Sequence, residues 1–70
     1  KGLVMRYSVD VFLGDQVLNA LKTDNLAEAY KKFAELIDLV ELRKLDTVVI
    51  FDDEIDASMK IIAQVSSFDF

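Results

Sequence analysis

The feature that most constrains the fold is one amphipathic segment in the middle of the chain, residues 26–43. Its apolar side chains recur every three or four residues and share one arc of about 120° on a helical wheel: Leu26, Ala29, Tyr30, Phe33, Leu36, Ile37 and Val40. Asn25 stands before this segment with capping-box spacing to Glu28, which predicts where the helix begins. A helix with a single apolar face packs against one layer, so the rest of the chain must supply that layer.

A β-hairpin is predicted before the helix. Residues 3–12 alternate as a strand does, and Gly14-Asp15 suits a two-residue turn because glycine accepts a positive φ. This turn sets Val11 opposite Leu18 and Val9 opposite Ala20 on one face of the hairpin. It sets Phe12 opposite Val17 and Asp10 opposite Asn19 on the other.

Two more strands are predicted after the helix, at residues 46–52 and 59–65, because both segments are rich in β-branched and aromatic residues. The loop between them covers residues 53–58, and residues 66–70 form a tail. Pairing Phe51 with Lys60 gives these strands a register that turns Val49, Phe51 and Ile62 to the same face.

The element order β-β-α-β-β predicts an α+β fold of two layers: a four-stranded, mainly antiparallel sheet with one helix packed on one face. At 70 residues, the chain is expected to form a single domain over residues 1–70. Strand orders 2-1-3-4 and 1-2-4-3 both allow an antiparallel sheet, and we favour 2-1-3-4 because it centres the longest apolar strand. The predicted core is Leu3, Met5, Tyr7, Val9, Val11, Leu18, Ala20, Leu26, Ala29, Tyr30, Phe33, Ile37, Val40, Val48, Ile50, Ile61 and Ala63.

The composition excludes several classes of function. The chain has no cysteine and no histidine, which removes disulfide frameworks, thiol catalysis and imidazole metal ligation. Its net charge of −5 disfavours direct binding to nucleic-acid phosphates, which needs clustered lysine and arginine. No apolar run is long enough for a membrane span or for the core of a signal peptide, so we expect no membrane partner and a cytoplasmic location.

The acidic segment Asp52, Asp53, Glu54 and Asp56 is the densest cluster of functional groups. It lacks the glycine and the terminal glutamate of an EF-hand loop, so a solvated hairpin loop is preferred over a calcium or magnesium site. The hydroxyl side chains have no histidine or Ser-x-x-Lys partner, and two glycines do not make a phosphate-binding loop. We therefore expect no catalytic, cofactor-binding or metal site.

The main functional signal is a set of apolar side chains at positions expected to be exposed. On the sheet face away from the helix these are Val4, Phe12, Val17, Leu21, Val49, Phe51 and Ile62. On the helix, Leu39 and Leu42 project into the polar arc. Alternatives stay open for both sets. The two leucines could be covered by the tail residues 68–70, or by the loop if the last helical turn bends under it. The sheet residues could turn toward the core in a different hairpin register, or be scattered apolar residues that tolerate exposure.

These observations favour a small non-enzymatic protein–protein interaction module, homodimeric through this second sheet face, that binds or inhibits a protein partner. Compact acidic domains of this size are typical of inhibitors encoded by phages. The alternative is an acidic decoy that imitates nucleic acid and occupies the site of a basic nucleic-acid-binding protein. The decoy would present Asp10, Asp15, Asp52, Asp53, Glu54 and Asp56.

Overall fold

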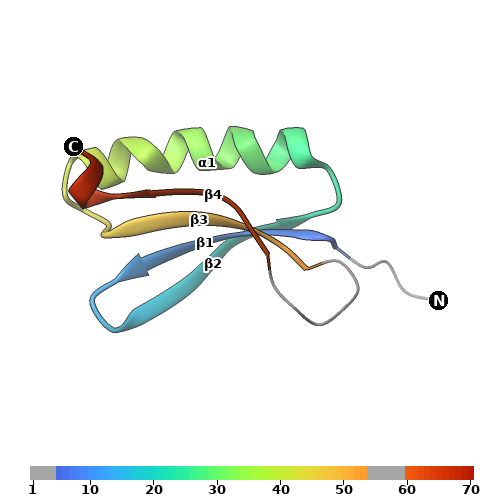
Figure 1. The fold of residues 1–70 in the computed structure, drawn as a ribbon, viewed down its shortest axis with the longest axis horizontal. Helices are drawn as coiled ribbons and strands as arrows, with labels where there is room; N and C mark the ends of the chain where they lie inside the picture. Colours follow the sequence, from blue (N-terminus) through green and yellow to red (C-terminus); the bar gives the residue numbers. More distant parts are fainter. Residues whose placement is uncertain (1–4, 54–59) are drawn as a thin grey trace.

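The computed structural model describes residues 5–53 and 60–70, and its elements follow the predicted order (Figure 1). Strands β1 (Tyr7–Leu13) and β2 (Gln16–Thr23) precede helix α1 (Leu26–Glu41). Strands β3 (Thr47–Asp52) and β4 (Lys60–Ser66) follow, and a short 3₁₀ turn closes the chain at Ser67–Asp69. The predicted α+β fold is therefore confirmed.

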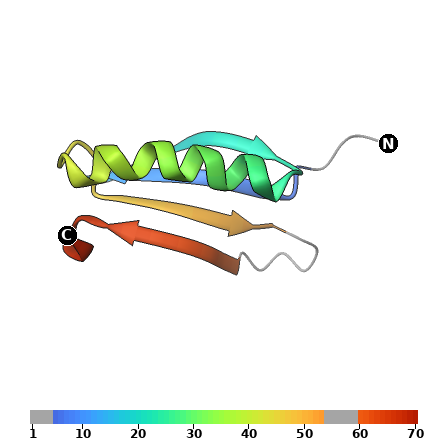
Figure 2. The ribbon, with the colours of Figure 1, turned by 90° about the horizontal axis from the view of Figure 1, so that it is seen from above.

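One antiparallel sheet carries all four strands in the order β2-β1-β3-β4, which is the order favoured from the sequence. Helix α1 lies along one face of this sheet, and the strands form the second layer below it (Figure 1). Seen from above, the helix runs along β1, and β3 and β4 lie to one side of it (Figure 2). Within residues 5–53 and 60–70 no helix lies over the other face of the sheet, and we call it the open face.

The core forms where the apolar arc of α1 meets the covered face of the sheet. Val9, Ala29, Val40, Val48 and Ile50 are fully buried there, and Phe33 is 8% exposed. The helical phase predicted from the sequence is therefore confirmed. The predicted core is wrong at five exposed positions: Met5, Leu18, Ala20, Tyr30 and Ile61.

The exposed positions have separate physical reasons. Met5 precedes β1 instead of lying within it. Leu18 faces the helix side opposite Val11, but the tip of the β1–β2 hairpin extends away from α1 (Figure 1), which leaves this side chain 58% exposed. Tyr30 lies at the edge of the helical arc, with its ring edge-on to Phe33 at 6.4 Å between centroids. The predicted core residue Leu3 lies outside the described residues.

A β-bulge in β2 changes the register of the first hairpin. The predicted pairs Phe12–Val17, Val11–Leu18 and Asp10–Asn19 are confirmed, but Val9 lies opposite Leu21 instead of Ala20. Ala20 is the extra residue, and beyond it the alternation of faces is inverted. Leu21 therefore packs against the core instead of lying on the open face, which corrects its predicted placement.

A second bulge changes the register of the β3–β4 pair in the same way. Ile50 lies opposite Ala63 and Phe51 opposite Ile61, so Ile62 is the extra residue and the predicted pairing of Phe51 with Lys60 is wrong. Ile62 packs against the core, whereas Ile61 shares the open face with Phe51 and is 53% exposed. The predicted roles of these two isoleucines are therefore exchanged.

The start of α1 is fixed by two polar side chains. The side-chain oxygen of Asn25 accepts hydrogen bonds from the backbone N–H groups of Ala27 (2.9 Å) and Glu28 (3.3 Å), as an N-cap does. In a capping box the Glu28 carboxylate would accept a hydrogen bond from the Asn25 N–H. Here the Thr23 hydroxyl takes that place between them. Thr23 accepts from the Asn25 N–H at 3.0 Å and donates its hydroxyl to Glu28 at 2.7 Å. The last residue of β2 therefore connects the sheet to the helix cap.

Replacing Asn25 with alanine is expected to lower the free energy of unfolding by about 1 kcal/mol, because two helix N–H groups lose their acceptor. Asp24→Ala is the matched control, since Asp24 is exposed and adjacent to the cap, and its effect should stay within about 0.5 kcal/mol. Urea denaturation of both variants measures the difference. Equal effects would mean that Asn25 is not the cap.

The end of α1 comes two residues earlier than the sequence suggested. Arg43 takes a φ of 64°, the left-handed conformation that ends many helices, and its N–H donates to the Val40 carbonyl at 3.0 Å. The Lys44 N–H donates to the Leu39 carbonyl at 2.8 Å, which completes the reversal into β3. The same Arg43 donates its guanidinium to the Ser67 carbonyl at 2.7 Å. The helix end and the C-terminal turn are thus joined.

Candidate functional site

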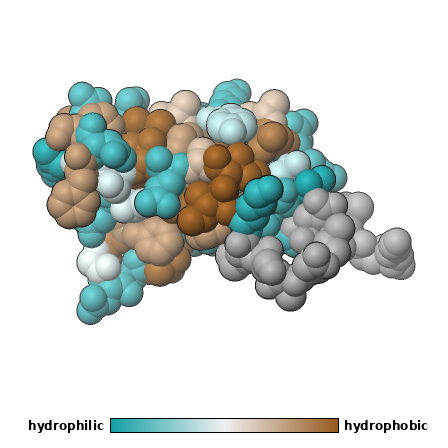
Figure 3. Space-filling view, viewed as in Figure 1, coloured by the Kyte–Doolittle hydropathy of each residue, from teal (hydrophilic) through white to brown (hydrophobic). Residues whose placement is uncertain are grey.

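The open face of the sheet gathers large apolar side chains from all four strands. Phe12 comes from β1, Val17 from β2 and Phe51 from β3, each alternating with residues that face the core. Ile61 of β4 joins them because the bulge turns it outward. In the space-filling view, apolar atoms gather over the middle of β4 and continue below it toward the β1–β2 hairpin (Figure 3). Val17 and Ile61 are more than half exposed, at 56% and 53%.

A hollow of about 370 Å³ lies on this face and gives it its shape. Its lining is Phe12, Gly14, Asp46, Thr47, Val49, Phe51, Ile61 and Gln64. Val49 is only 3% exposed although the helix is on the other side of the sheet, so the larger side chains around it cover it. The hollow therefore has an apolar floor and apolar sides, with polar groups toward the end nearest the β1–β2 turn.

Hydrogen bonds hold the polar end of the hollow in place. The Asp46 carboxylate accepts from the Gly14 N–H at 2.7 Å, and the Asp46 N–H donates to the Phe12 carbonyl at 2.9 Å. Within the same face, Asn19 donates its side-chain amide to the Asp10 carboxylate at 2.8 Å. The β1–β2 turn, the start of β3 and the middle of the face are thereby kept in one arrangement.

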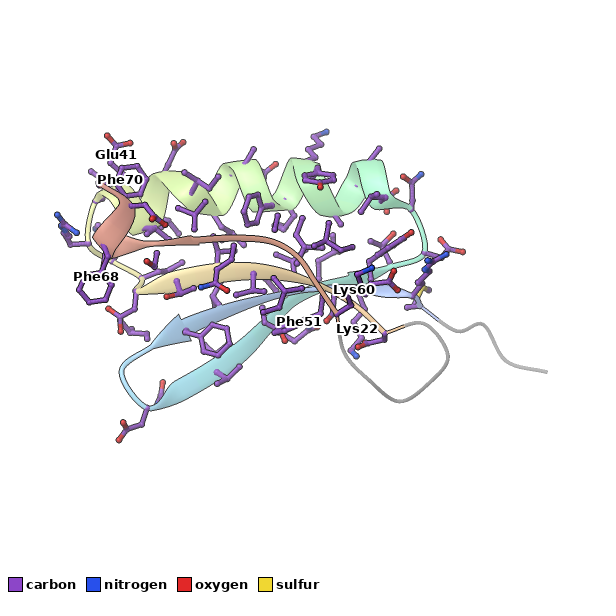
Figure 4. All side chains as sticks on the ribbon, viewed as in Figure 1. Lys22, Glu41, Phe51, Lys60, Phe68 and Phe70 are labelled. Atoms are coloured by element: carbon purple, nitrogen blue, oxygen red, sulfur yellow. The ribbon has the colours of Figure 1, made fainter. Side chains whose placement is uncertain are left out.

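Basic side chains lie at the opposite end of the sheet. Lys22 pairs with Ser8, which in turn pairs with Phe51, so Lys22 shares the open face with Phe51. Figure 4 shows Lys22 and Lys60 near the Phe51 end of the sheet, while the C-terminal phenylalanines lie at the other end. The open face is therefore apolar in its middle, with Lys22 at one end and Asp46 at the other. Lys60 lies opposite Asp52, on the side of the sheet away from Phe51 and Ile61.

The structure brings together only part of the predicted interface set. Phe12, Val17, Val49 and Phe51 lie on the open face. Val4 lies outside the described residues, and Leu21 and Ile62 turn to the core. Leu39 and Leu42 lie at the end of α1, on the other side of the sheet, where Leu39 is half-buried and Leu42 is 62% exposed. The two leucines are not part of the open-face site.

The exposed apolar residues missing from the predicted interface include Ile61 and Phe68. Ile61 was assigned to the core, and only the bulge at Ile62 corrects this. One interpretation of the sequence has the tail with Phe68 covering the helix end, but the Phe68 side chain is 94% exposed. In Figure 4, Phe68 points away from α1, whereas Phe70 lies toward the end of the helix, near Glu41. The run Ser66-Ser67-Phe68-Asp69 carries a turn signal that could have indicated an ordered end of the chain.

The acidic cluster is divided between described and undescribed residues. Asp52 accepts two hydrogen bonds from the Arg6 guanidinium, both at 3.0 Å, and the Arg6 carbonyl accepts from the Asp53 N–H at 2.7 Å. Glu54 and Asp56 lie outside the described residues. Over residues 5–53 and 60–70, acidic side chains form no group of three or more that could hold a metal ion.

We therefore expect millimolar calcium or magnesium to leave the melting temperature unchanged. The Asp52 oxygens are held by Arg6 and would have to exchange a charged partner for the ion. An ion bound at 100 times its dissociation constant would add about 2.7 kcal/mol, a shift of several degrees for a domain of this size. Differential scanning fluorimetry with and without each ion measures it, and a shift that large would overturn the solvated-loop interpretation.

Comparisons of the chain with protein-family models, with curated proteins and with solved structures found no match. Among the described residues, no helix has the length and apolar character needed to cross a bilayer. The open face, with its apolar hollow, is therefore the feature that bears on function.

Proposed function

We propose that the protein is a small non-enzymatic protein–protein interaction module that binds a second copy of itself through the open face. The observation that carries the proposal is the apolar hollow bounded by Phe12, Phe51 and Ile61, on a face that no helix of the described part of the chain covers. A two-layer domain usually presents polar side chains on its second face. Leaving this face in water forfeits about 25 cal/mol for every Å² of apolar surface.

The size of the face fits a small dimer. Four strands of six to eight residues, spaced about 4.8 Å apart with about 3.3 Å per residue, cover a footprint of about 440 Å². The smallest specific interfaces bury about 600 Å² on each partner. The face supplies most of that area, and its rim must supply the rest. Closed pairing through one shared patch gives a symmetric dimer, the commonest oligomer.

The edges of the sheet favour face-to-face contact over strand-to-strand pairing. Both outer strands, β2 and β4, carry a bulge, at Ala20 and Ile62. Each also carries a lysine near the same end, Lys22 and Lys60. Bulges and lysines on edge strands disfavour the addition of another strand. The open face remains as the surface on which a second copy can bury apolar side chains.

An acidic decoy for a nucleic-acid-binding protein is the weaker proposal. Two of its candidate carboxylates have partners within the chain: Asp10 accepts from Asn19, and Asp52 from Arg6. Lys22 shares the open face with the apolar residues and reduces its negative charge. A decoy would act through many unpaired acids on one surface, and these two carboxylates are already engaged within the chain.

Light scattering over a concentration series, at about 0.05 M and about 1 M salt, tests the proposal. We expect a mass near twice the 7.9 kDa of one chain at about 100 μM, and the same dimer at both salt concentrations. Apolar burial is not screened by salt, whereas contacts between exposed charges are. A mass of one chain at every concentration would contradict self-association. Dissociation at high salt would contradict an apolar interface.

A further inference from the structure

The C-terminal turn holds one aromatic side chain in solvent. Phe68 is 94% exposed, yet the backbone on both sides of it is fixed. The Ser67 N–H donates to the Asp46 carbonyl at 2.8 Å, and the Ser67 carbonyl accepts from the Arg43 guanidinium at 2.7 Å. The Asp69 carboxylate accepts from the Ser66 N–H at 2.8 Å. The exposure of Phe68 is therefore not the fraying of a chain end.

An aromatic side chain fixed in this way is suited to binding. Much of the entropy cost of ordering a chain end on binding is already met, because its turn is held by the Arg43 side chain and the Asp46 backbone carbonyl after α1. Large aromatic side chains that enter a pocket on a partner are typical of the centres of protein interfaces. Phe68 is not in the hollow of its own chain, since almost all of its surface is exposed.

The hollow of a second copy is a receptor of the right size and chemistry. Its volume of about 370 Å³ is in the range of about 300–1,000 Å³ that accepts drug-sized ligands, so it accommodates one phenyl ring. Two of its apolar side chains, Phe51 and Ile61, lie toward the end away from the C-terminal turn, whereas Phe12 lies toward the nearer end. A phenylalanine buries about 150–250 Å². Added to the footprint of about 440 Å², this area reaches the roughly 600 Å² that each partner of a small specific dimer buries.

We propose that Phe68 of each copy inserts against Phe51 and Ile61 in the hollow of the other copy. This inference rests on the proposed self-association through the open face. Ser66, next to the turn, pairs with Thr47 at one end of β3, and Phe51 lies toward the other end. In this dimer the open faces of the two sheets lie against each other. The two-fold axis lies between them, perpendicular to the strands and close to Val49. This symmetry places each end of one sheet over the opposite end of the other. Each turn then lies over the Phe51 end of the partner.

The charges favour the same arrangement. Asp69 follows Phe68 in the turn, and Lys22 and Lys60 lie near the Phe51 end of the sheet (Figure 4). When the strands of the two facing sheets run in opposite directions, each acidic turn, which follows β4, lies over the Lys60 end of the partner's β4. Lys22 is on β2, at the other edge of the sheet. A parallel arrangement would place the two acidic turns together. Complementary charges at the rim of an interface select the orientation of the partners more than they add affinity.

Crosslinking between two single-cysteine variants tests the contact, because the natural chain has no cysteine. Phe68→Cys and Ile61→Cys are purified separately, shown to keep the circular dichroism of the parent, and mixed at about 1 mM with a short bis-maleimide. This concentration offsets the weaker association expected when one copy lacks the Phe68 ring. We expect the mixed Phe68→Cys–Ile61→Cys crosslink to be the main product by mass spectrometry. Leu42→Cys replaces Ile61→Cys in the control, since Leu42 is 62% exposed but lies at the end of α1.

A mixed crosslink no stronger than that of the Leu42→Cys control would overturn the inference. So would a dominant product that joins two Phe68→Cys chains, because that product requires the turns to meet each other. If the parent is a dimer by light scattering and either result occurs, the open-face proposal stands and the placement of Phe68 is wrong. If the parent is a monomer, the proposed function itself fails.

Truncation of the ring gives an independent readout. Phe68→Ala should weaken dimerisation by about 30-fold or more, as loss of an interface hot spot does. The melting temperature of the monomer at low concentration should not change, because the side chain contributes almost no buried surface within its own chain. Phe70→Ala is the matched control from the same turn, with a half-exposed ring. Unchanged dimerisation of Phe68→Ala would contradict the inference.

Discussion

Phe33→Ala is expected to leave the domain largely unfolded as a monomer. Phe33 is 8% exposed and packs at the centre of the contact between α1 and the sheet. Loss of a buried phenylalanine costs about 3–5 kcal/mol, through lost burial and through the cavity left behind. A 70-residue domain has a total stability of about 4–10 kcal/mol. Circular dichroism at low concentration should show the loss of helix signal.

Glu35→Ala is the control for this variant, because it lies on the exposed side of the same helix. Glu35 pairs with Lys32 at 3.4 Å, and both side chains are partly in solvent. Such a surface pair contributes little, so the free energy of unfolding should stay within about 0.5 kcal/mol of the parent. Similar losses in the two variants would show that the helix packs through a different face.

Phe51→Glu is expected to give a folded monomer. Phe51 lies on the open face, where the core does not depend on it, and it lines the apolar hollow. A carboxylate there would have to be buried without a partner in the dimer, which costs enough to weaken association by about 100-fold or more. Sedimentation velocity should give the mass of one chain, and circular dichroism should match that of the parent.

Leu42→Glu is the matched control, since it adds the same charge at an exposed leucine outside the open face. It should remain dimeric. A Phe51→Glu protein that stays dimeric would place the interface elsewhere on the molecule. An unfolded Phe51→Glu protein would show that the open face is needed for the stability of the monomer.

The sequence was sufficient for the elements, their order and the phase of the helix. In residues 26–41 the apolar period leaves only one face that can be buried, and Ala29, Phe33 and Val40 occupy it. The hairpin turn at Gly14 set the register correctly for the adjacent pairs Phe12–Val17 and Val11–Leu18, because a short turn fixes its neighbours. Predictions close to a strong local signal were therefore confirmed.

The wrong predictions of which strand residues face the core begin where no turn or alternation fixes the register. Ile61 and Ile62 are identical side chains in adjacent positions, so the sequence cannot tell which of them faces the core. One bulge decides it, and a single extra residue inverts the face of the residues beyond it. The bulge in β2 likewise decides that Leu21, and not Ala20, faces the core. Both bulges lie on edge strands, where only one neighbour constrains the register.

The position of Phe68 depends on contacts between distant parts of the chain. The turn is held by Arg43 and by the backbone of Asp46, more than 20 residues away. No period or spacing in residues 66–70 indicates these partners. The open-face residues Phe12 and Phe51 were predicted from the sequence because strand alternation places them. The exposed position of Phe68 was not predicted.

Amide NMR spectra of the parent over about a hundredfold dilution test self-association through the open face most directly, since they identify the surface that becomes buried. A dimer formed through this face predicts concentration-dependent shifts at Phe12, Phe51, Ile61 and Gln64, which line the hollow. It predicts no shift at Ala27 and Glu35, which are exposed on α1. Shifts confined to α1, or spectra that do not change with concentration, would contradict an interface on the open face.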